Sequence, residues 1–216
     1  QRINGFNSCK SPYVLQLDDD VIIEENTIEE LLNFSLENDN TAVAPRYKNN
    51  LKISKIYRKP DNLLLKFYHW IINGSRGYSP GSISLSGFNY SDENSDENFK
   101  EQEWLSGGAI LHQKKNLILN NYFMFNYSKC YCEDILHSLK LRENKVRLFK
   151  LYTASISTES GSIINNSNIF ETLKNLCFEM NVRFYIVKNY KKSYIRFALY
   201  YFIFFLRIIL KFIKGK

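Results

Sequence analysis

Three consecutive aspartates, Asp18, Asp19 and Asp20, follow a short apolar run at residues 13–17. The run has the composition of a buried strand, so the three carboxylates should lie at the carboxyl edge of a sheet, where α/β proteins bind ligands. Side chains two residues apart can project to the same side, and Asp18 and Asp20 could therefore share one Mg²⁺ or Mn²⁺ ion. Such an ion suits a diphosphate, because it offsets the negative charge of the phosphate oxygens. A solvated acidic turn is the structural alternative, and the triplet alone does not decide between the two.

A glycine pair lies in a second segment, which we predict to be a strand over residues 104–111. Gly107 and Gly108 would let a ligand approach the backbone closely, because neither has a side chain. Trp104 could form an apolar wall for a sugar ring, and Ser106 lies between the tryptophan and the glycines. A glycine kink beside a core tryptophan would explain the same pattern without a ligand.

Two further carboxylates, Glu133 and Asp134, begin a helix that we predict over residues 133–143. Acidic side chains are favoured at a helix N-terminus because they interact with the free N–H groups and the helix dipole, so capping is the structural alternative. The functional interpretation makes Asp134 a general base that removes a proton from an acceptor hydroxyl.

The three histidines are weaker candidates for catalysis. His69 should pack within an apolar helix at residues 62–72, and His137, one turn after Asp134, should be an orienting or surface group. His112 follows the glycine segment and is the histidine best placed to approach the site.

Apolar periodicity predicts the elements that must position these groups. We expect helices over residues 27–38, 62–72, 133–143 and 168–180, and strands over residues 13–17, 41–45, 51–57, 104–111 and 146–152. Residues 74–98 break the periodicity, and we expect the acidic run at 91–97 to be a mobile loop. Mixed helices and strands of this kind predict an α/β layered fold.

The start of the first long helix carries a capping signal. Asn26 and Glu29 have the spacing of a capping box, in which each side chain accepts a hydrogen bond from a backbone N–H of the helix start. We expect Ile28, Leu31 and Leu32 of this helix to face the core.

The positive charge of the chain is concentrated at its C-terminal end. The chain has 29 Lys and Arg and 22 Asp and Glu, a net charge of +7. Nine of the basic residues and none of the acidic ones lie in residues 181–216, so the first 180 residues carry 20 basic and 22 acidic side chains. A body with no basic surplus argues against nucleic acid as a partner.

Residues 193–214 have the pattern of a helix that lies on a membrane surface. The longest uncharged stretch, 197–206, is half of the ~20 apolar residues that a spanning helix needs. At about 100° per residue the cations fall within an arc of roughly 100°, and Phe, Leu and Ile occupy the rest; these cations are Lys192, Arg196, Arg207, Lys211 and Lys214. We therefore expect two regions, a catalytic part at 1–190 and a basic amphipathic tail at 191–216. A helix packed on the protein body is the alternative.

The ordered set of motifs at residues 18–20, 104–108 and 133–134 resembles the family 2 inverting glycosyltransferases of the glycosyltransferase-A fold, over roughly residues 2–195. The resemblance implies a partial glycosyltransferase-A (Rossmann-like) mixed sheet flanked by helices. It also implies that Asp18 and Asp20 hold Mg²⁺ or Mn²⁺ on the donor diphosphate and that Asp134 is the base. The substrate-binding residues that it implies are Asp19, Trp104, Ser106, Gly107, Gly108 and Glu133.

Two departures from the family pattern qualify the resemblance. Residues 2–12 match the segment just before the metal-binding strand, so the resemblance implies that the N-terminal nucleotide-binding half is missing. Many relatives carry a histidine after the last strand, where this sequence has Thr158, and the neighbouring Glu159 could replace it as an oxygen ligand.

The resemblance implies transfer of a sugar, with inversion, from a nucleotide-sugar donor to a saccharide or lipid-linked saccharide acceptor. The implied setting is bacterial surface polysaccharide or glycolipid assembly at the cytoplasmic face of the cell membrane. The absence of a C-x-x-C pair among the four cysteines agrees with a reducing compartment. Two other hypotheses stay open: a truncated, non-catalytic membrane-associated partner protein, and a nucleotidyltransferase, which would need a basic, glycine-rich phosphate loop that the chain does not show.

Overall fold

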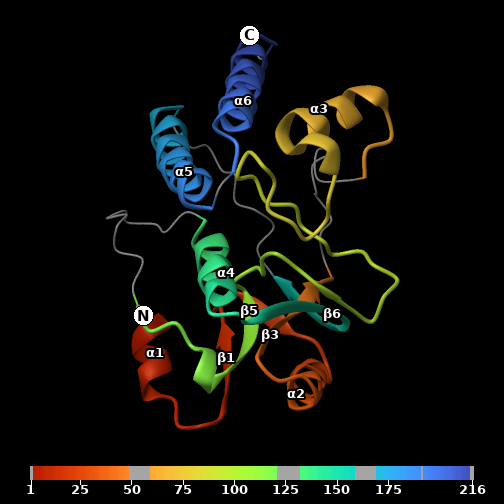
Figure 1. Ribbon diagram of the computed structural model, residues 1–216, viewed down its shortest axis with the longest axis vertical. Helices are drawn as coiled ribbons and strands as arrows, with labels where there is room; N and C mark the ends of the chain where they lie inside the picture. Colours follow the sequence, from red (N-terminus) through yellow and green to blue (C-terminus); the bar gives the residue numbers. More distant parts are fainter. Residues whose placement is uncertain (1, 49–58, 121–131, 159–168, 191, 215–216) are drawn as a thin grey trace.

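The computed structural model describes residues 2–48, 59–120, 132–158, 169–190 and 192–214, which form a mixed sheet with helices on both faces (Figure 1). The strands are β1 (Tyr13–Leu17), β2 (Val21–Ile23), β3 (Thr41–Tyr47), β4 (Phe99–Glu101), β5 (Ala109–Gln113) and β6 (Arg147–Thr158). The α-helices are α1 (Arg2–Ser8), α2 (Thr27–Glu37), α3 (Leu63–Asn73), α4 (Glu133–Glu143), α5 (Ile169–Asn189) and α6 (Tyr194–Lys214).

Strand direction brings the ends of three strands to one edge of the sheet. The strands are ordered β1-β5-β3-β6-β2, and β4 pairs with β6 outside this path. β5 is antiparallel to both β1 and β3, whereas β3 is parallel to β6. The carboxyl ends of β1, β3 and β6 therefore share an edge with the beginning of β5, and we call it the carboxyl edge. Asp18, Tyr47 and Thr158 lie along it.

Alternate residues of the strands face opposite helices, as the two-residue period of a β-strand requires. On one face Val43 packs with Leu31 and Phe34 of α2. On the other face Ala42 packs in a cluster with Leu141 of α4. Each fully buried Leu or Phe side chain stabilises the fold by about 1.5–3 kcal/mol. The predicted α/β fold, a mixed sheet flanked by helices, is confirmed.

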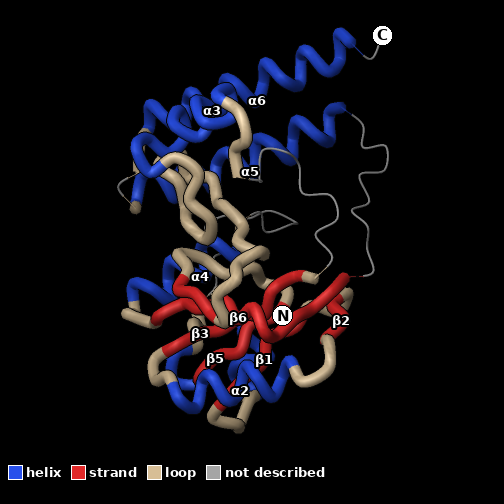
Figure 2. The backbone as a smooth tube through the Cα atoms, turned by 90° about the vertical axis from the view of Figure 1, so that its right-hand side faces the viewer, coloured by secondary structure: helices blue, strands red, loops and turns tan. Residues whose placement is uncertain are grey.

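A layer of helices, α3, α5 and α6, lies on the far side of α4 from the sheet (Figure 2). α4 packs a second apolar surface, which includes Ile135, against Val182 and Ile186 of α5. Ile72 of α3 and Tyr200 of α6 belong to an aromatic-rich cluster that joins the outer helices. The outer layer is thus connected to the sheet through α4.

Most predicted elements are confirmed, and β3, β6 and α5 run further than predicted. The predicted strand at 51–57 lies outside the described residues. The predicted strand over residues 104–111 is wrong in its first half, because β5 begins only at Ala109. Residues 104–108 lie outside the sheet and run beside α4, where the Leu105 N–H donates to the Ser138 hydroxyl over 2.9 Å.

The predicted capping box at the start of α2 is wrong. Asn26 adopts a left-handed conformation with φ 62°, which asparagine tolerates, and its side chain makes no capping hydrogen bond. Thr27 fixes this end of the helix instead, because its hydroxyl donates to the Ser155 carbonyl of β6 over 2.8 Å. Ile28 is half exposed rather than core-facing, whereas Leu31 is buried as predicted.

The acidic run at 91–97, which we predicted to be a mobile loop, has two buried carboxylates. Asp92 and Glu93 are buried, and each makes an ion pair with a lysine of the sheet: Asp92 with Lys100 over 3.0 Å, and Glu93 with Lys150. A buried carboxylate needs such a partner because leaving it unpaired costs several kcal/mol. These two pairs fasten the 74–98 loop to β4 and β6.

His112 and His137 pack edge to face in the interior, with ring centroids 5.3 Å apart, and Phe6 of α1 contacts both. His137 is therefore buried rather than at the surface. Neither ring nitrogen of His112 has a hydrogen-bond partner among the described residues. Burial holds the pKa of His112 well below 6.5 and lowers the pKa of His137 to about 3. His69 is also buried, and its Nδ1 lies 3.1 Å from the Tyr90 hydroxyl.

This histidine pair should make the fold sensitive to acid. The folded pKa values lie below the unfolded value of 6.5, so the unfolded state binds more protons as the pH falls from about 6.5 toward about 3, and stability is lost in that window. Urea unfolding between about pH 7 and pH 4 should show that His137→Gln declines less steeply than the wild type, by up to ~1.4 kcal/mol per pH unit. If the unfolding free energies of the two proteins fall in parallel with pH, the histidine pair is not the cause of the acid sensitivity, even if one protein is more stable at every pH.

Candidate active site

The three aspartates form the turn that leaves β1. The Asp18 N–H donates to the Gly108 carbonyl over 2.9 Å, which fastens the turn to the segment just before β5. Val21, at the start of β2, pairs with Thr158 at the end of β6. The aspartate turn and Thr158 therefore lie together at the carboxyl edge.

The segment 105–108 holds the start of α4 against this turn. The Gly107 N–H donates to the Asp134 carboxylate, and the Gly107 carbonyl accepts a 2.9 Å hydrogen bond from Gln16 of β1. Asp18 and Asp134 are far apart in the sequence but close enough in the fold for the charge of Asp134 to raise the pKa of Asp18. The predicted association of the three motifs at one site is therefore present in the structure.

Side chains of the protein itself occupy the space next to both glycines. A Cβ atom on Gly107 would lie 2.3 Å from Oδ1 of Asp134, and one on Gly108 would lie 1.8 Å from the Tyr47 hydroxyl oxygen. We predicted that these glycines would admit a ligand to the backbone. The structure shows that they admit the carboxylate of α4 and the phenol of β3.

The backbone just before α4 is in an uncommon conformation. Cys132 has φ 55°, in the left-handed region that a residue with a Cβ rarely adopts, and its side chain does not cap the helix. Such a conformation costs on the order of 1–3 kcal/mol and is found preferentially at functional sites. It sets the direction in which Glu133 and Asp134 enter the helix.

Negative charge accumulates at the carboxyl edge. Burial and the neighbouring charges of Asp134 and Asp20 raise the pKa of Asp18. Burial also raises the pKa of Asp134, although the Gly107 N–H and the positive charge of Arg2 act in the opposite direction. Asp19 is exposed at the tip of the turn. A cation at this position would relieve the mutual repulsion of the carboxylates.

Arg2 and Tyr47 belong to the site, although sequence reasoning missed both. Arg2 pairs with Glu133 over 3.0 Å, and its charge offsets part of the upward shift in the pKa of both Asp18 and Asp134. Burial and the charges of Asp18 and Asp134 raise the pKa of Tyr47 to about 12, while its hydroxyl is hydrogen-bonded to Ser106. Tyr47 lies at the end of β3, on the carboxyl edge, and this position in the sequence could have identified it as a candidate site residue. No sequence pattern marked Arg2.

A cavity of about 610 Å³ lies beside β1, within the size range of small-molecule sites. Arg2 and Phe6 of α1 line it, together with Gln16, Asp18 and Glu133. One wall of the cavity is therefore formed by the same charged residues that surround Asp134.

Trp104 supports the site from the side of the 74–98 loop. Its indole N–H donates to the Tyr90 carbonyl over 2.9 Å, and its ring packs against the apolar cluster between α4 and α5. These contacts are those of a core tryptophan, the structural alternative to the sugar-binding wall that we considered for Trp104.

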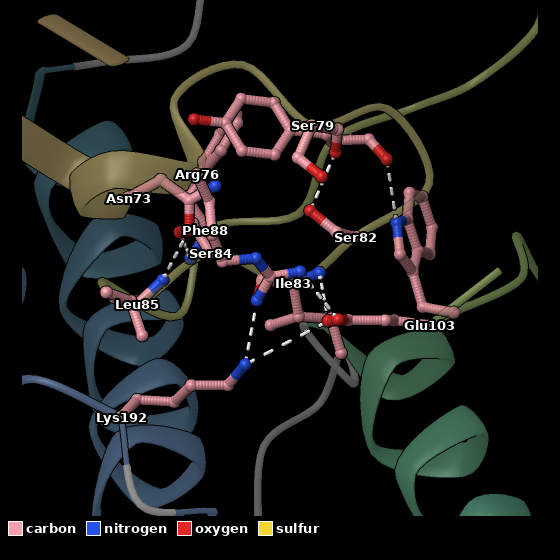
Figure 3. Close-up of polar contacts among 12 residues, drawn as sticks. Asn73, Arg76, Ser79, Ser82, Ile83, Ser84, Leu85, Phe88, Glu103 and Lys192 are labelled. Atoms are coloured by element: carbon pink, nitrogen blue, oxygen red, sulfur yellow. Dashed lines mark hydrogen bonds and ion pairs between the residues drawn. The ribbon is translucent and has the colours of Figure 1, made fainter. Parts of the chain in front are cut away.

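The neighbouring residue, Glu103, holds the same loop from below. It accepts hydrogen bonds from Arg76 over 2.7 Å and from the Ile83 N–H over 2.8 Å, and Lys192 lies 4.0 Å away (Figure 3). Burial opposes ionisation, but these donors hold the pKa of Glu103 below its usual range. Glu103 therefore connects the 74–98 loop to Lys192, which lies just before α6.

The donor set of the carboxyl edge suits a hard divalent cation, because it consists of carboxylates that repel one another. Asp18 and Asp20 are the residues that would hold it. Within the described residues, no group of three or more His, Cys, Asp and Glu side chains is arranged as a metal site. The remaining ligands of an ion would therefore come from substrate phosphate or water, as is usual for Mg²⁺. Glu159, the other oxygen ligand that we considered, lies outside the described residues.

A comparison with known proteins matches the first part of the chain to one family model. Residues 1–97 match the family model of glycosyl transferase family 2, and this match includes the aspartate turn, Arg2 and Tyr47. Among solved structures, a crystal structure of GalNAc-T7 with UDP, GalNAc and Mn2+ is similar, with 12% sequence identity and a TM-score of 0.46. That similarity covers 73% of this chain and 29% of the other, so the chain spans less than a third of that protein's length. No curated protein sequence matches the chain.

The contact between Gly107 and Asp134 can be tested by substitution. Gly107→Ala should cost about 1–3 kcal/mol of unfolding free energy, because the new methyl group overlaps the carboxylate. Gly5→Ala in α1 is the matched control, since a Cβ there meets nothing within 4 Å and should be neutral or slightly stabilising. In an Asp134→Ala background the cost of Gly107→Ala should shrink. Equal costs of Gly107→Ala in both backgrounds, measured by urea unfolding, would refute the proposed contact.

Proposed function

We propose that this chain transfers a sugar from a nucleotide-sugar donor to an acceptor hydroxyl with inversion. The observation that carries the proposal is the convergence of Asp18 and Asp134 at the carboxyl edge, one from the turn after β1 and the other from the start of α4. The match of residues 1–97 to glycosyl transferase family 2 supports the same reaction class.

In this proposal Asp18 and Asp20 hold Mg²⁺ or Mn²⁺ against the donor diphosphate. The ion, when bound, supplies positive charge that stabilises the nucleoside diphosphate as it leaves. Arg2 adds a fixed positive charge at the same edge and is held there by Glu133. Asp19, Ser106 and the backbone at Gly108 border the space in which donor and acceptor would meet.

Asp134 is the proposed general base. It accepts the proton of the acceptor hydroxyl as that oxygen attacks the anomeric carbon, while the bond from this carbon to the phosphate oxygen breaks on the opposite side. The raised pKa of Asp134 makes its carboxylate a stronger base, as proton removal from a hydroxyl requires. The Gly107 N–H fixes the orientation of this carboxylate. Attack from one side with departure from the other inverts the configuration at the anomeric carbon.

A saccharide carried on a membrane lipid fits the proposal as acceptor, because α6 carries a long apolar stripe beside basic residues. We extend the proposal to surface polysaccharide or glycolipid assembly by a protein held at the cytoplasmic face of a bacterial membrane. This setting rests on the resemblance of the motifs to family 2 enzymes.

Two substitutions separate the proposed roles. Asp20→Ala should abolish metal-dependent binding of nucleotide sugars, measured by calorimetry with a panel of donors. Asp134→Asn should leave this binding in place and lower the rate of transfer by a factor on the order of 10²–10⁴, because only the base is lost. Asp96→Asn, the same chemical change at an exposed position of the 91–97 run, should alter neither measurement.

Two results would overturn the proposal. If folded wild-type protein binds no nucleotide sugar with Mg²⁺ or Mn²⁺, the hypothesis of a non-catalytic partner protein takes its place. If Asp134→Asn transfers sugar at the wild-type rate, the base is another residue.

A further inference from the structure

One side of α3 presents large apolar side chains to solvent. Leu63 and Leu64 are 81% and 82% exposed, and Phe67 and Trp70 are 58% and 52% exposed. The opposite side of the helix, which includes the buried Ile72, packs into the protein. Single exposed apolar residues are common, but four on two consecutive turns form a patch of the kind that marks an interaction surface.

α6 carries a second exposed apolar stripe. Its members are Ile195, Leu199, Phe202, Leu206 and Leu210, of which Ile195 is 75% and Phe202 is 61% exposed. At about 100° per residue these five positions fall within an arc of roughly 80°. Phe197, Tyr200, Tyr201 and Phe204 lie on the packed side of the helix. Packing within the described residues therefore accounts for one side of α6 and leaves the other uncovered.

The two surfaces meet where the helices touch. α3 packs against α6, and Arg196 donates hydrogen bonds to the backbone carbonyls of Trp70 and Ile71. The Arg196 guanidinium also lies over the Trp70 ring, 5.4 Å from its centroid, and the Phe67 ring stacks with Trp70 at a centroid distance of 5.8 Å. Arg196 follows Ile195 directly, so the α3 patch and the α6 stripe adjoin at this contact. We call them together the α3–α6 face.

Charge indicates what covers this face. The sequences of α3 and α6 contain no Asp or Glu, and their charged residues are Lys66, Arg196, Arg207, Lys211 and Lys214. A second copy of the chain docked on α3 and α6 would bring basic helices together with no acidic residue on either to offset their charge, which disfavours self-association. An anionic lipid bilayer offers both an apolar interior for the exposed side chains and negative headgroups for the cations. None of the described helices is long and apolar enough to cross a membrane.

We propose that the α3–α6 face docks on an anionic lipid bilayer, with Trp70 and Phe67 as aromatic anchors at the interface. The proposal rests on the membrane association proposed above for α6 and adds α3 as an equal part of the docking surface. It does not depend on sugar transfer. Tryptophan is favoured at the interface between lipid and water because its ring is apolar and its N–H stays hydrated.

Vesicle binding tests the proposal on the full chain. The probes are vesicles of phosphatidylcholine alone and vesicles that also contain phosphatidylglycerol. The wild type should sediment with the anionic vesicles, and less so at high salt. A triple variant of α3, Leu63→Ser, Leu64→Ser and Phe67→Ser, should lower the partition coefficient at least roughly tenfold. The control is Ile28→Ser with Leu36→Ser on α2, two exposed apolar residues outside the face, which should leave partitioning unchanged.

Tryptophan fluorescence reports on α3 directly. The chain has two tryptophans, so Trp104→Phe leaves Trp70 as the only emitter. Its emission should shift to shorter wavelength on addition of anionic vesicles and should be quenched by brominated lipid. Circular dichroism verifies that each variant is folded.

Three outcomes would overturn the proposal: no binding of the wild type to anionic vesicles, vesicle binding that the α3 variant does not weaken, or bound protein whose Trp70 emission stays that of a water-exposed indole. A dimer in light scattering that the α3 variant dissociates, without vesicle binding, would assign the face to a second copy instead. Donor binding measured without vesicles separates these outcomes from a failure of the proposed sugar transfer.

Discussion

The start of α4 lies against Gly107, with the Asp134 carboxylate in the space that a side chain at residue 107 would occupy. The Gly107 backbone occupies the space beside the Asp134 carboxylate and donates a hydrogen bond to it, while its carbonyl is held by Gln16 of β1. This contact fixes the helix that carries Asp134 to the strand that carries Asp18. Ile83 of the 74–98 loop and Val182 and Ile186 of α5 pack on α4 in turn.

The same close approach determines the electrostatics of the site. Two carboxylates from different elements are held within range of each other and partly removed from water, which destabilises their charged forms. Arg2 relieves part of this cost, and the Tyr47 phenol stays protonated beside them. A bound cation, or a substrate that carries one, would stabilise the charged carboxylates. This stabilisation connects the geometry of the site with the proposed reaction.

Local patterns in the sequence predicted the elements, and contacts between distant residues decided the rest. β1 and α4 were predictable because apolar period and acidic helix starts are local signals. The capping box at Asn26 failed because Thr27 bonds to Ser155 of β6 instead, a partner that no local pattern shows. The acidic run was misread for the same reason, since its buried carboxylates depend on lysines of β4 and β6. The order of the three motifs in the sequence predicted that they belong to one site. No sequence pattern marked Arg2, which the folded structure places beside Glu133.

The most direct test is a carbon-13 NMR titration of the aspartate carboxyl groups. The pKa of Asp18 should lie above its ordinary value of 3.8, because partial burial and the charges of Asp134 and Asp20 disfavour its ionised form. It should fall in Asp134→Asn, where one like charge is removed, and it should also fall when Mg²⁺ is added to the wild type. An Asp18 that titrates near 3.8 in all three samples would show that the carboxylates do not form one site, and the account would be wrong at its centre.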